Sequence, residues 1–211
     1  TGAGISNYTI TYNNASMVVT PATITVGATA ADKVYNGNTV ATVSLTPSGV
    51  LLGDIVSINY VAANFASKDV AYSAVPAVIA QDVNITGISL VGAGASNYTL
   101  AGITSATATA KITRAPLLIT AVAANKEYDN TDIASVSLSA NVISGDVVTF
   151  ASTGATFASS NVAYTAGGAV TSQTVNITGL SLGGAQRGNY SLANPSSAAT
   201  TTATITPAPL T

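Results

Sequence analysis

Apolar and polar residues alternate with a period of two along most of the chain. In the stretch TVATVSL, one side carries Ala41, Val43 and Leu45. In the stretch ATATAKIT, three threonines and a lysine alternate with Ala108, Ala110 and Ile112. Such alternation is typical of half-buried β-strands, and Gly, Asn, Asp and Pro separate the strands as turn residues do. The pattern therefore predicts an all-β protein.

The same order of strands and turns occurs twice, about 92 residues apart. KVYNGNT at Lys33 returns as KEYDNTD at Lys126, and VNITGISL at Val83 returns as VNITGLSL at Val175. SNYTI at Ser6 resembles SNYTL at Ser96, so the chain also begins inside such a unit. The repeat divides the chain into the tail of a preceding repeat (1–22), a first full repeat (23–115) and a second full repeat (116–211).

The expected architecture is a row of small antiparallel β-sandwich domains, Ig-like or Greek-key, arranged end to end. The linker is short, because the strand near Ile112 leads through Arg114, Ala115 and Pro116 almost directly into the next strand. Proline favours extended backbone, so we expect little swing between the domains. The tail cannot bury its apolar face alone, and we expect it to pair with the first full domain or with a neighbouring chain.

Composition narrows the function classes. Only 7% of the residues are charged, with six Lys plus Arg against eight Asp plus Glu, so the chain has no basic field for nucleic acid. No run of eighteen apolar residues occurs, which argues against membrane insertion. Cysteine is absent, and no disulfide supports the fold.

Catalytic chemistry has few candidate residues. The chain contains no His and no Cys, which removes the usual bases, thiolates and zinc ligands. Asp54 and Asp146 hold the same acidic position in both repeats, and a single acid in a Gly-Asp turn is more often a turn cap than half of a catalytic pair. We therefore expect no enzyme and no metal site. Calcium is the one cofactor that the Asp and Asn residues leave open.

A buried Lys-Asn amide bond is a further alternative, because three residue types that such a bond needs recur in both repeats. The first repeat supplies Lys33, Asp54 and Asn97, and the second supplies Lys126, Asp146 and Asn189. A lysine beside a turn more often lies on the surface with its stem over apolar neighbours. An intact mass one ammonia lighter for each bond would reveal the amide.

The Lys-x-Tyr phrase, the Gly-Asp pair and the late VNITG and NYTL motifs together resemble the YDG domain of bacterial filamentous-haemagglutinin-like surface adhesins, a relative of the MBG repeats. The resemblance covers both full repeats. Its structural motif corresponds here to Lys33, Tyr35, Asn36, Gly37, Asp54 and Asn97, and in the second copy to Lys126, Tyr128, Asp129, Asp146 and Asn189. The first copy has Asn36 in place of the aspartate, and the second has Asn130 in place of the glycine. The resemblance implies an extracellular, repetitive, β-rich segment.

The sequence thus predicts a structural stalk on a bacterial surface, or secreted from it, whose partners are neighbouring repeats of the same chain. The alternative is a carbohydrate- or receptor-binding adhesin module that contacts host or abiotic surface glycans. Most aromatic residues recur in matched pairs, as core anchors would: Tyr35/Tyr128, Phe65/Phe157, Tyr72/Tyr164 and Tyr98/Tyr190. The aromatic residues without a matched partner are the first candidates for ligand contact: Tyr12, Tyr60 and Phe150.

Overall fold

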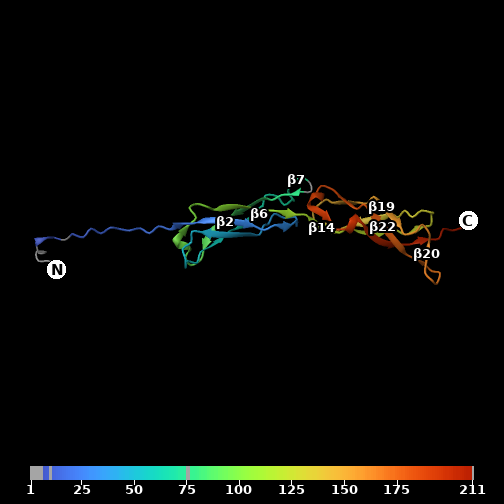
Figure 1. Cartoon of the computed structure of the whole chain (residues 1–211), viewed down its shortest axis with the longest axis horizontal. Helices are drawn as coiled ribbons and strands as arrows, with labels where there is room; N and C mark the ends of the chain where they lie inside the picture. The colour runs from blue at the N-terminus through green and yellow to red at the C-terminus, as the bar shows by residue number, and fades with distance from the viewer. Residues whose placement is uncertain (1–6, 10, 75–76, 211) are drawn as a thin grey trace.

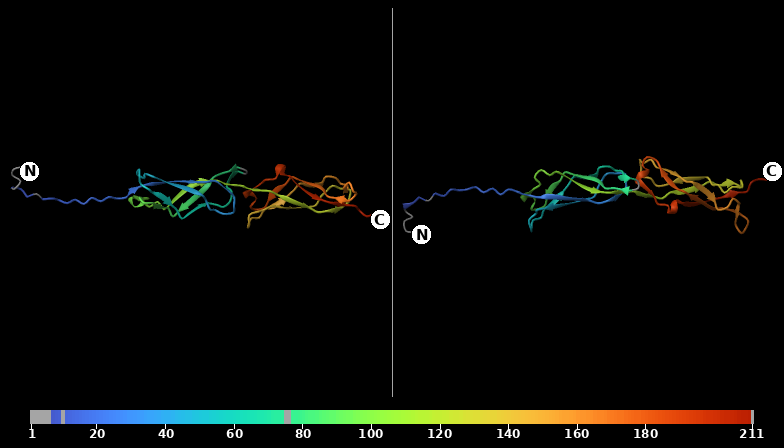
Figure 2. Two further views of the ribbon diagram at one scale, coloured as in Figure 1. Left: turned by 90° about the horizontal axis from the view of Figure 1, so that it is seen from below. Right: turned by 45° about the horizontal axis from the view of Figure 1, so that its top comes forward.

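The computed structural model describes residues 7–9, 11–74 and 77–210 and contains two β units that follow one another along a single long axis (Figure 1). Residues 11–20 extend away from the first unit along the same axis (Figure 2). The described residues contain strands and short 3₁₀ turns, and none of their helices is long and apolar enough to cross a membrane. The predicted tandem all-β fold is confirmed, whereas the Ig-like or Greek-key sandwich stays a prediction.

The first unit combines one long antiparallel pair, one three-stranded antiparallel sheet and four short pairs. The long pair is β2 (Thr25–Ala30) with β4 (Val43–Ser48), and the sheet is β12 (Ser105–Ala110), β9 (Gln81–Thr86) and β6 (Ala62–Phe65). Two short pairs are antiparallel: β5 (Ser57–Asn59) with β10 (Ser89–Val91), and β7 (Tyr72–Ala74) with β8 (Ala77–Val78). Two are parallel: β1 (Ala22–Thr23) with β11 (Tyr98–Thr99), and β3 (Lys33–Val34) with β13 (Ile112–Thr113). The 3₁₀ turn η2 (Ala95–Asn97) precedes β11.

The second unit repeats this arrangement. Its long pair is β15 (Thr120–Ala123) with β17 (Val136–Ser139), and its sheet is β19 (Gly154–Phe157), β22 (Gln173–Thr178) and β25 (Ala199–Ala203). Its antiparallel short pairs are β18 (Thr149–Ala151) with β23 (Ser181–Gly183), and β20 (Ala163–Tyr164) with β21 (Val170–Thr171). Its parallel pairs are β14 (Ala115–Leu117) with β24 (Tyr190–Leu192), and β16 (Lys126–Glu127) with β26 (Ile205–Thr206). The turns η3 (Arg187–Asn189) and η4 (Pro195–Ser197) flank β24.

Each unit has its own apolar core along the central strand of its sheet. Val83 and Ile85 of β9 are fully buried, and Val175 and Ile177 occupy the same places in β22. Asn84 and Asn176, which lie between them, face outward, as the alternation predicts. The inward orientation of Ala41, Ala108, Ala110 and Ile112 is likewise confirmed, since all four are buried.

The core of the first unit continues across the junction into the second. Its cluster of buried residues includes Ala115, Leu117 and Tyr190, which lie in β14 and β24 of the second unit. Only Arg114 separates β13, the last strand of the first unit, from β14, the first strand of the second. The short linker was predicted, and its consequence is that the two ends meet in direct contact (Figure 1).

The predicted tail pairs with the first unit only at its last residue. Ala22 in β1 lies opposite Tyr98 in β11, but residues 11–20 are exposed and belong to no strand. Residues 1–6 and 10, which are part of the same prediction, lie outside the described residues. Residues 11–20 therefore do not pair with the first domain, which already has its own closing strand in β12, and the alternative that they pair with a neighbouring chain stays a prediction.

Candidate inter-repeat interface

The repeated Lys-x-Tyr phrase forms a tight turn that the lysine holds together. In the first repeat, Lys33 Nζ donates to the backbone oxygens of Asn38 (2.7 Å) and Val40 (3.0 Å) and lies over the ring of Phe65. Burial lowers the pKa of Lys33. Asn36 Oδ1 accepts a hydrogen bond from the backbone N–H of Asn38, so the position of the family's aspartate serves the turn.

The second repeat builds the same turn with a carboxylate. Lys126 Nζ donates to the backbone oxygen of Thr131 (2.7 Å) and forms a 2.6 Å ion pair with Asp129. The hydrogen bonds from Lys126 and from Thr131 hold the pKa of Asp129 at about 2. Asn130 takes the place of Gly37, and both residues have positive φ, 63° and 80°. The motif residues around Lys33 and Lys126 are thus turn-forming residues in both copies.

Tyr35 extends from the first turn into the second repeat. β3 pairs with β13 just before Arg114, and β14 pairs with β24 just after it, so Tyr35 and Tyr190 come to lie on the two sides of the linker. Their rings meet edge to face, with centroids 5.6 Å apart. Tyr35 is 2% exposed, which places a residue of the turn at the centre of a contact between repeats.

Both tyrosine hydroxyls donate to one carboxylate, that of Asp146. The donor-acceptor distances are 2.8 Å from Tyr35 and 2.6 Å from Tyr190, and Tyr190 in turn accepts from the backbone N–H of Ile143 (3.1 Å). Lys68 Nζ lies 3.6 Å from the same carboxylate, whose side chain is only 2% exposed. A buried carboxylate needs hydrogen-bond donors, and this one has two hydroxyls, with an ammonium group nearby as an ion-pair partner.

These contacts shift the titration of the phenols. Burial, and then the hydrogen bond to Asp146, raises the pKa of Tyr190 to about 12 and raises the pKa of Tyr35 further still. Both phenols are therefore neutral donors at physiological pH. The interpretation of Asp146 as a turn cap was wrong, because its carboxylate oxygens accept from tyrosines of two different repeats.

A second group of contacts surrounds Asn189, which is 4% exposed. Its Oδ1 accepts from the backbone N–H of Val70 (2.9 Å), and its Nδ2 donates to Asp69 Oδ1 (2.7 Å). Tyr72 donates to the backbone oxygen of Gly188 beside it. These hydrogen bonds lie between residues more than one hundred positions apart in sequence, and they fix the rotation of one repeat against the other.

Gly37 completes the contact by allowing close approach. A Cβ atom at this position would lie 3.0 Å from Ile143 Cγ2 of the second repeat, and the positive φ of Gly37 also favours glycine. The YDG-type turn of the first repeat is thus shaped for the junction, whereas Asn130 occupies the same position at the far end of the second repeat.

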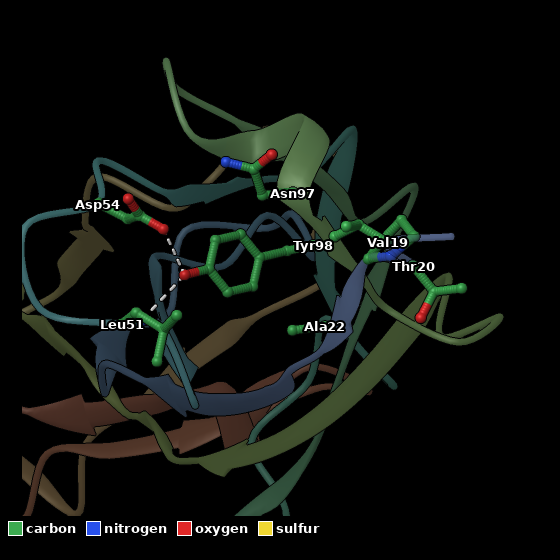
Figure 3. A pocket seen from close by; sticks show the side chains of 8 residues that line it. Val19, Thr20, Ala22, Leu51, Asp54, Asn97 and Tyr98 are labelled. Atoms are coloured by element: carbon green, nitrogen blue, oxygen red, sulfur yellow. Dashed lines mark hydrogen bonds between the residues drawn. The ribbon is translucent and has the colours of Figure 1, made fainter. Parts of the chain in front are cut away.

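The opposite end of the first repeat carries the same acceptor groups without a repeat on top of them. Tyr98 donates to Asp54 Oδ2 (2.5 Å) and accepts from the backbone N–H of Leu51 (3.0 Å) (Figure 3). Together with Asn97, these residues border a cavity of about 310 Å³ that residues 19–22 also line. Asp54, like Asp146, is a tyrosine acceptor and not a turn cap.

The structure does not bring together the residues of the proposed Lys-Asn amide. Lys33 Nζ is bonded within its own turn, Asp54 is bonded to Tyr98, and Asn97 is an exposed residue of η2. In the second repeat, Lys126 pairs with Asp129, whereas Asp146 and Asn189 lie at the junction. No cluster of three or more acidic residues that could hold a metal ion occurs among the described residues.

The three unmatched aromatic residues lie in different surroundings. Tyr12 is exposed in the extended segment before the first unit. Tyr60 packs against the first core, and Phe150 packs against both cores. Their part in ligand contact stays a prediction.

Matched aromatic pairs are not all core anchors. Tyr35 is buried at the junction, but its counterpart Tyr128 is 36% exposed, and Tyr164, the counterpart of Tyr72, is also exposed. Sequence reasoning overlooked Lys68, Asp69 and Tyr72 as interface residues. The one available signal was the change from Lys68-Asp69 to Ser160-Asn161 between the repeats.

The fold and the junction define a tandem all-β repeat protein whose units join through a tyrosine-carboxylate contact. The sequence model of the YDG domain matches residues 20–110 and 113–202, and the chain belongs to the YDG domain family. No curated protein and no solved structure matches the chain significantly.

Proposed function

We propose that this chain is a structural, non-enzymatic stalk segment of a bacterial surface or secreted adhesin, in which rigid junctions hold YDG repeats end to end. The observation that carries the proposal is the Asp146 site, where one buried carboxylate receives hydroxyls from Tyr35 of one repeat and Tyr190 of the next. A stalk needs such contacts, because a linker of one residue fixes distance but not rotation.

Several features support a spacer over a ligand-binding module. The strands present mainly threonine, serine and asparagine outward, and two of the three unmatched aromatic residues, Tyr60 and Phe150, pack against the apolar cores. The resemblance to the YDG domains of filamentous-haemagglutinin-like proteins supports the extracellular location.

The experiment measures the distance between spin labels on the two repeats. The chain has no cysteine, so Thr46→Cys on β4 and Ser137→Cys on β17, both exposed, give two unique attachment sites. A rigid stalk gives one narrow distance distribution, and Asp146→Ala should broaden it. Asp54→Ala is the matched control, because it removes the equivalent carboxylate from the end that carries no neighbouring repeat.

A broad distribution in the unsubstituted background would contradict the stalk. The folded chain should also be tested for binding to glycans and host matrix proteins, with and without calcium. Saturable binding that is lost on substitution of Tyr12, Tyr60 or Phe150 would replace the stalk by the carbohydrate- or receptor-binding alternative.

A further inference from the structure

The chain has only two arginines, Arg114 and Arg187, and both line one cavity of about 250 Å³ at the junction. Arg114 is the linker residue, and Arg187 begins η3 of the second unit. The first unit contributes Tyr72 of β7, which lies near the boundary between the units (Figure 1). The other lining residues belong to the second unit: Leu182, Gly188, Tyr190, Ser191 and Leu192. We call this space the junction cavity.

Neither arginine belongs to the repeated pattern of the chain. Pro21 and Pro207 occupy the position of Arg114 at the other two repeat boundaries, and Ala95 occupies the position of Arg187 in the first repeat. The common fold is therefore built with proline and alanine at these positions. The two arginines are specific to this junction, although they are far apart in sequence.

The carboxylates of the junction have partners other than the arginines. Among residues 7–9, 11–74 and 77–210, the ion pairs involve lysines only. Asp146 accepts from two tyrosines and lies beside Lys68, and Asp69 accepts from Asn189. Arg187 is also exposed to solvent. Two guanidinium groups on one cavity, neither of them paired with a carboxylate, favour a negatively charged ligand.

The rest of the lining restricts which anion fits. The hydroxyls of Tyr72 and Tyr190 already donate to the backbone oxygen of Gly188 and to Asp146, so these tyrosines offer ring carbon atoms to a ligand. Two leucines add apolar surface, and one serine adds a hydroxyl group. A guanidinium group matches the planar carboxylate with paired hydrogen bonds, and the apolar side chains match a ring attached to that carboxylate.

We propose that the junction cavity binds one sugar acid, a monosaccharide unit that carries a carboxylate. The carboxylate accepts hydrogen bonds from Arg114 and Arg187, and the C–H face of the sugar ring packs against Tyr72 and the leucines. The sugar hydroxyls face Ser191 and the solvent on the side of Arg187. A cavity of about 250 Å³ is smaller than the pockets of drug-sized ligands, about 300–1,000 Å³, so it holds a single ring.

The bound sugar acid would contact both units at once, because Tyr72 and Arg187 belong to different ones. The site lies beside the Asp146 contact, with Tyr190 as a member of both. The inference goes beyond the proposed stalk function and does not depend on it, since no residue of the Lys-x-Tyr turn takes part.

The experiment titrates the isotope-labelled chain with glucuronate and follows its backbone amide resonances by NMR. Two ligand controls separate the parts of the sugar acid: glucose has the ring without the carboxylate, and acetate has the carboxylate without the ring. The expected result is a saturable shift of the Gly188 and Ser191 amides with glucuronate. Glucose should give no saturable shift, and acetate should bind about tenfold more weakly, because it lacks the contacts of the ring.

Three variants test the assigned residues. Arg187→Ala introduces the residue of the first repeat, and Arg114→Gln removes the charge while it keeps most of the side-chain stem and the linker backbone. Each should weaken glucuronate binding about tenfold, since charge-assisted hydrogen bonds are lost. Lys111→Ala is the matched control, because Lys111 is an exposed cation near the linker that does not line the cavity, and it should leave the affinity unchanged.

Each other outcome overturns the sugar-acid site. Glucose that binds as tightly as glucuronate would show that the arginines do not select the ligand, and acetate that binds as tightly would show that the ring makes no contact. Affinity that both arginine variants leave unchanged would place the ligand elsewhere. No shift at the highest soluble concentration of glucuronate also overturns the inference. The spin-label distances test the stalk separately, because they are measured without any ligand.

Discussion

The covered end of the second repeat and the open end of the first are built from the same residues in two different environments. At the covered end, Asp146 accepts from Tyr190 and from Tyr35 of the neighbouring repeat, and its side chain is almost fully buried. At the open end, Asp54 accepts from Tyr98 and is exposed. The tyrosine-aspartate hydrogen bond within each repeat is therefore present with or without a neighbouring repeat. The end of the repeat that carries this hydrogen bond is preorganised for docking.

The residues around the Lys-x-Tyr turn differ more between the two repeats than the Gly-Asp turn and its tyrosine do. Tyr35 is accompanied by Gly37, Lys68 and Asp69, whereas Tyr128 is accompanied by Asn130, Ser160 and Asn161. The first set contacts the second repeat. The comparison teaches that the aspartate and tyrosine of the Asp146 site recur in both repeats, whereas the residues that contact them from the neighbouring repeat differ between the two copies.

The largest effect is expected for Asp146→Ala. It leaves two buried hydroxyls without their acceptor and Lys68 without its partner, which should lower the free energy of unfolding by about 3 kcal/mol. Asp54→Ala removes one hydrogen bond at an exposed end and should cost less than about 1 kcal/mol. Urea unfolding of both variants measures the difference, and equal losses would show that the covered and open ends do not differ in energy.

Much of this fold could be predicted from local pattern, because strand alternation and turn chemistry are local properties. The period-two spacing of Ala108, Ala110 and Ile112 was sufficient to assign their inward face. The junction is not local: Tyr35 and Asp146 are 111 positions apart, and their meeting depends on how β3, β13, β14 and β24 pair. Recurrence identified the tyrosines and aspartates but could not tell which copy contacts another repeat.

Gly37→Ala tests the close approach of the Lys-x-Tyr turn of the first repeat to Ile143 of the second. Alanine at positive φ is strained, and its Cβ would also press on Ile143, so we expect a loss of about 2 kcal/mol. Gly145→Ala is the matched control, because Gly145 has a similar φ but no atom within 4 Å of its Cβ position, and it should cost about 1 kcal/mol.

Ile143→Leu removes the methyl group that the new Cβ would meet and gives the second repeat the residue found at Leu51. In the double variant, Gly37→Ala should therefore cost no more than Gly145→Ala, as thermal or urea unfolding can determine. If Gly37→Ala still lowered the free energy of unfolding by the full amount in the Ile143→Leu background, backbone strain alone would explain why position 37 is glycine.

Alkaline pH should weaken the covered end. Tyr190 has an ordinary pKa of 10 in the unfolded chain and about 12 in the folded one, so the neutral phenol favours folding. This contribution is fully present below pH 10 and is lost as the pH rises through about 12. Tyr190→Phe should lower stability at neutral pH and flatten the decline between these values. Ultraviolet absorbance of tyrosinate follows the titration, and a decline as steep in Tyr190→Phe as in the unsubstituted chain would assign it to other groups.

The smallest effect is expected for Lys68→Ala. This variant tests how much the Lys68 ammonium group contributes to balancing the buried charge of Asp146. Lys68 lies 3.6 Å from the carboxylate, but its own side chain is 44% exposed, so water screens the attraction. We expect a loss of about 0.5 kcal/mol in low salt that disappears in high salt, measured by urea unfolding at both ionic strengths. Ser160→Lys at the far end should leave stability unchanged in either condition. A loss for Lys68→Ala as large as that for Asp146→Ala would mean that the ammonium group, and not the two phenols, makes the buried carboxylate tolerable.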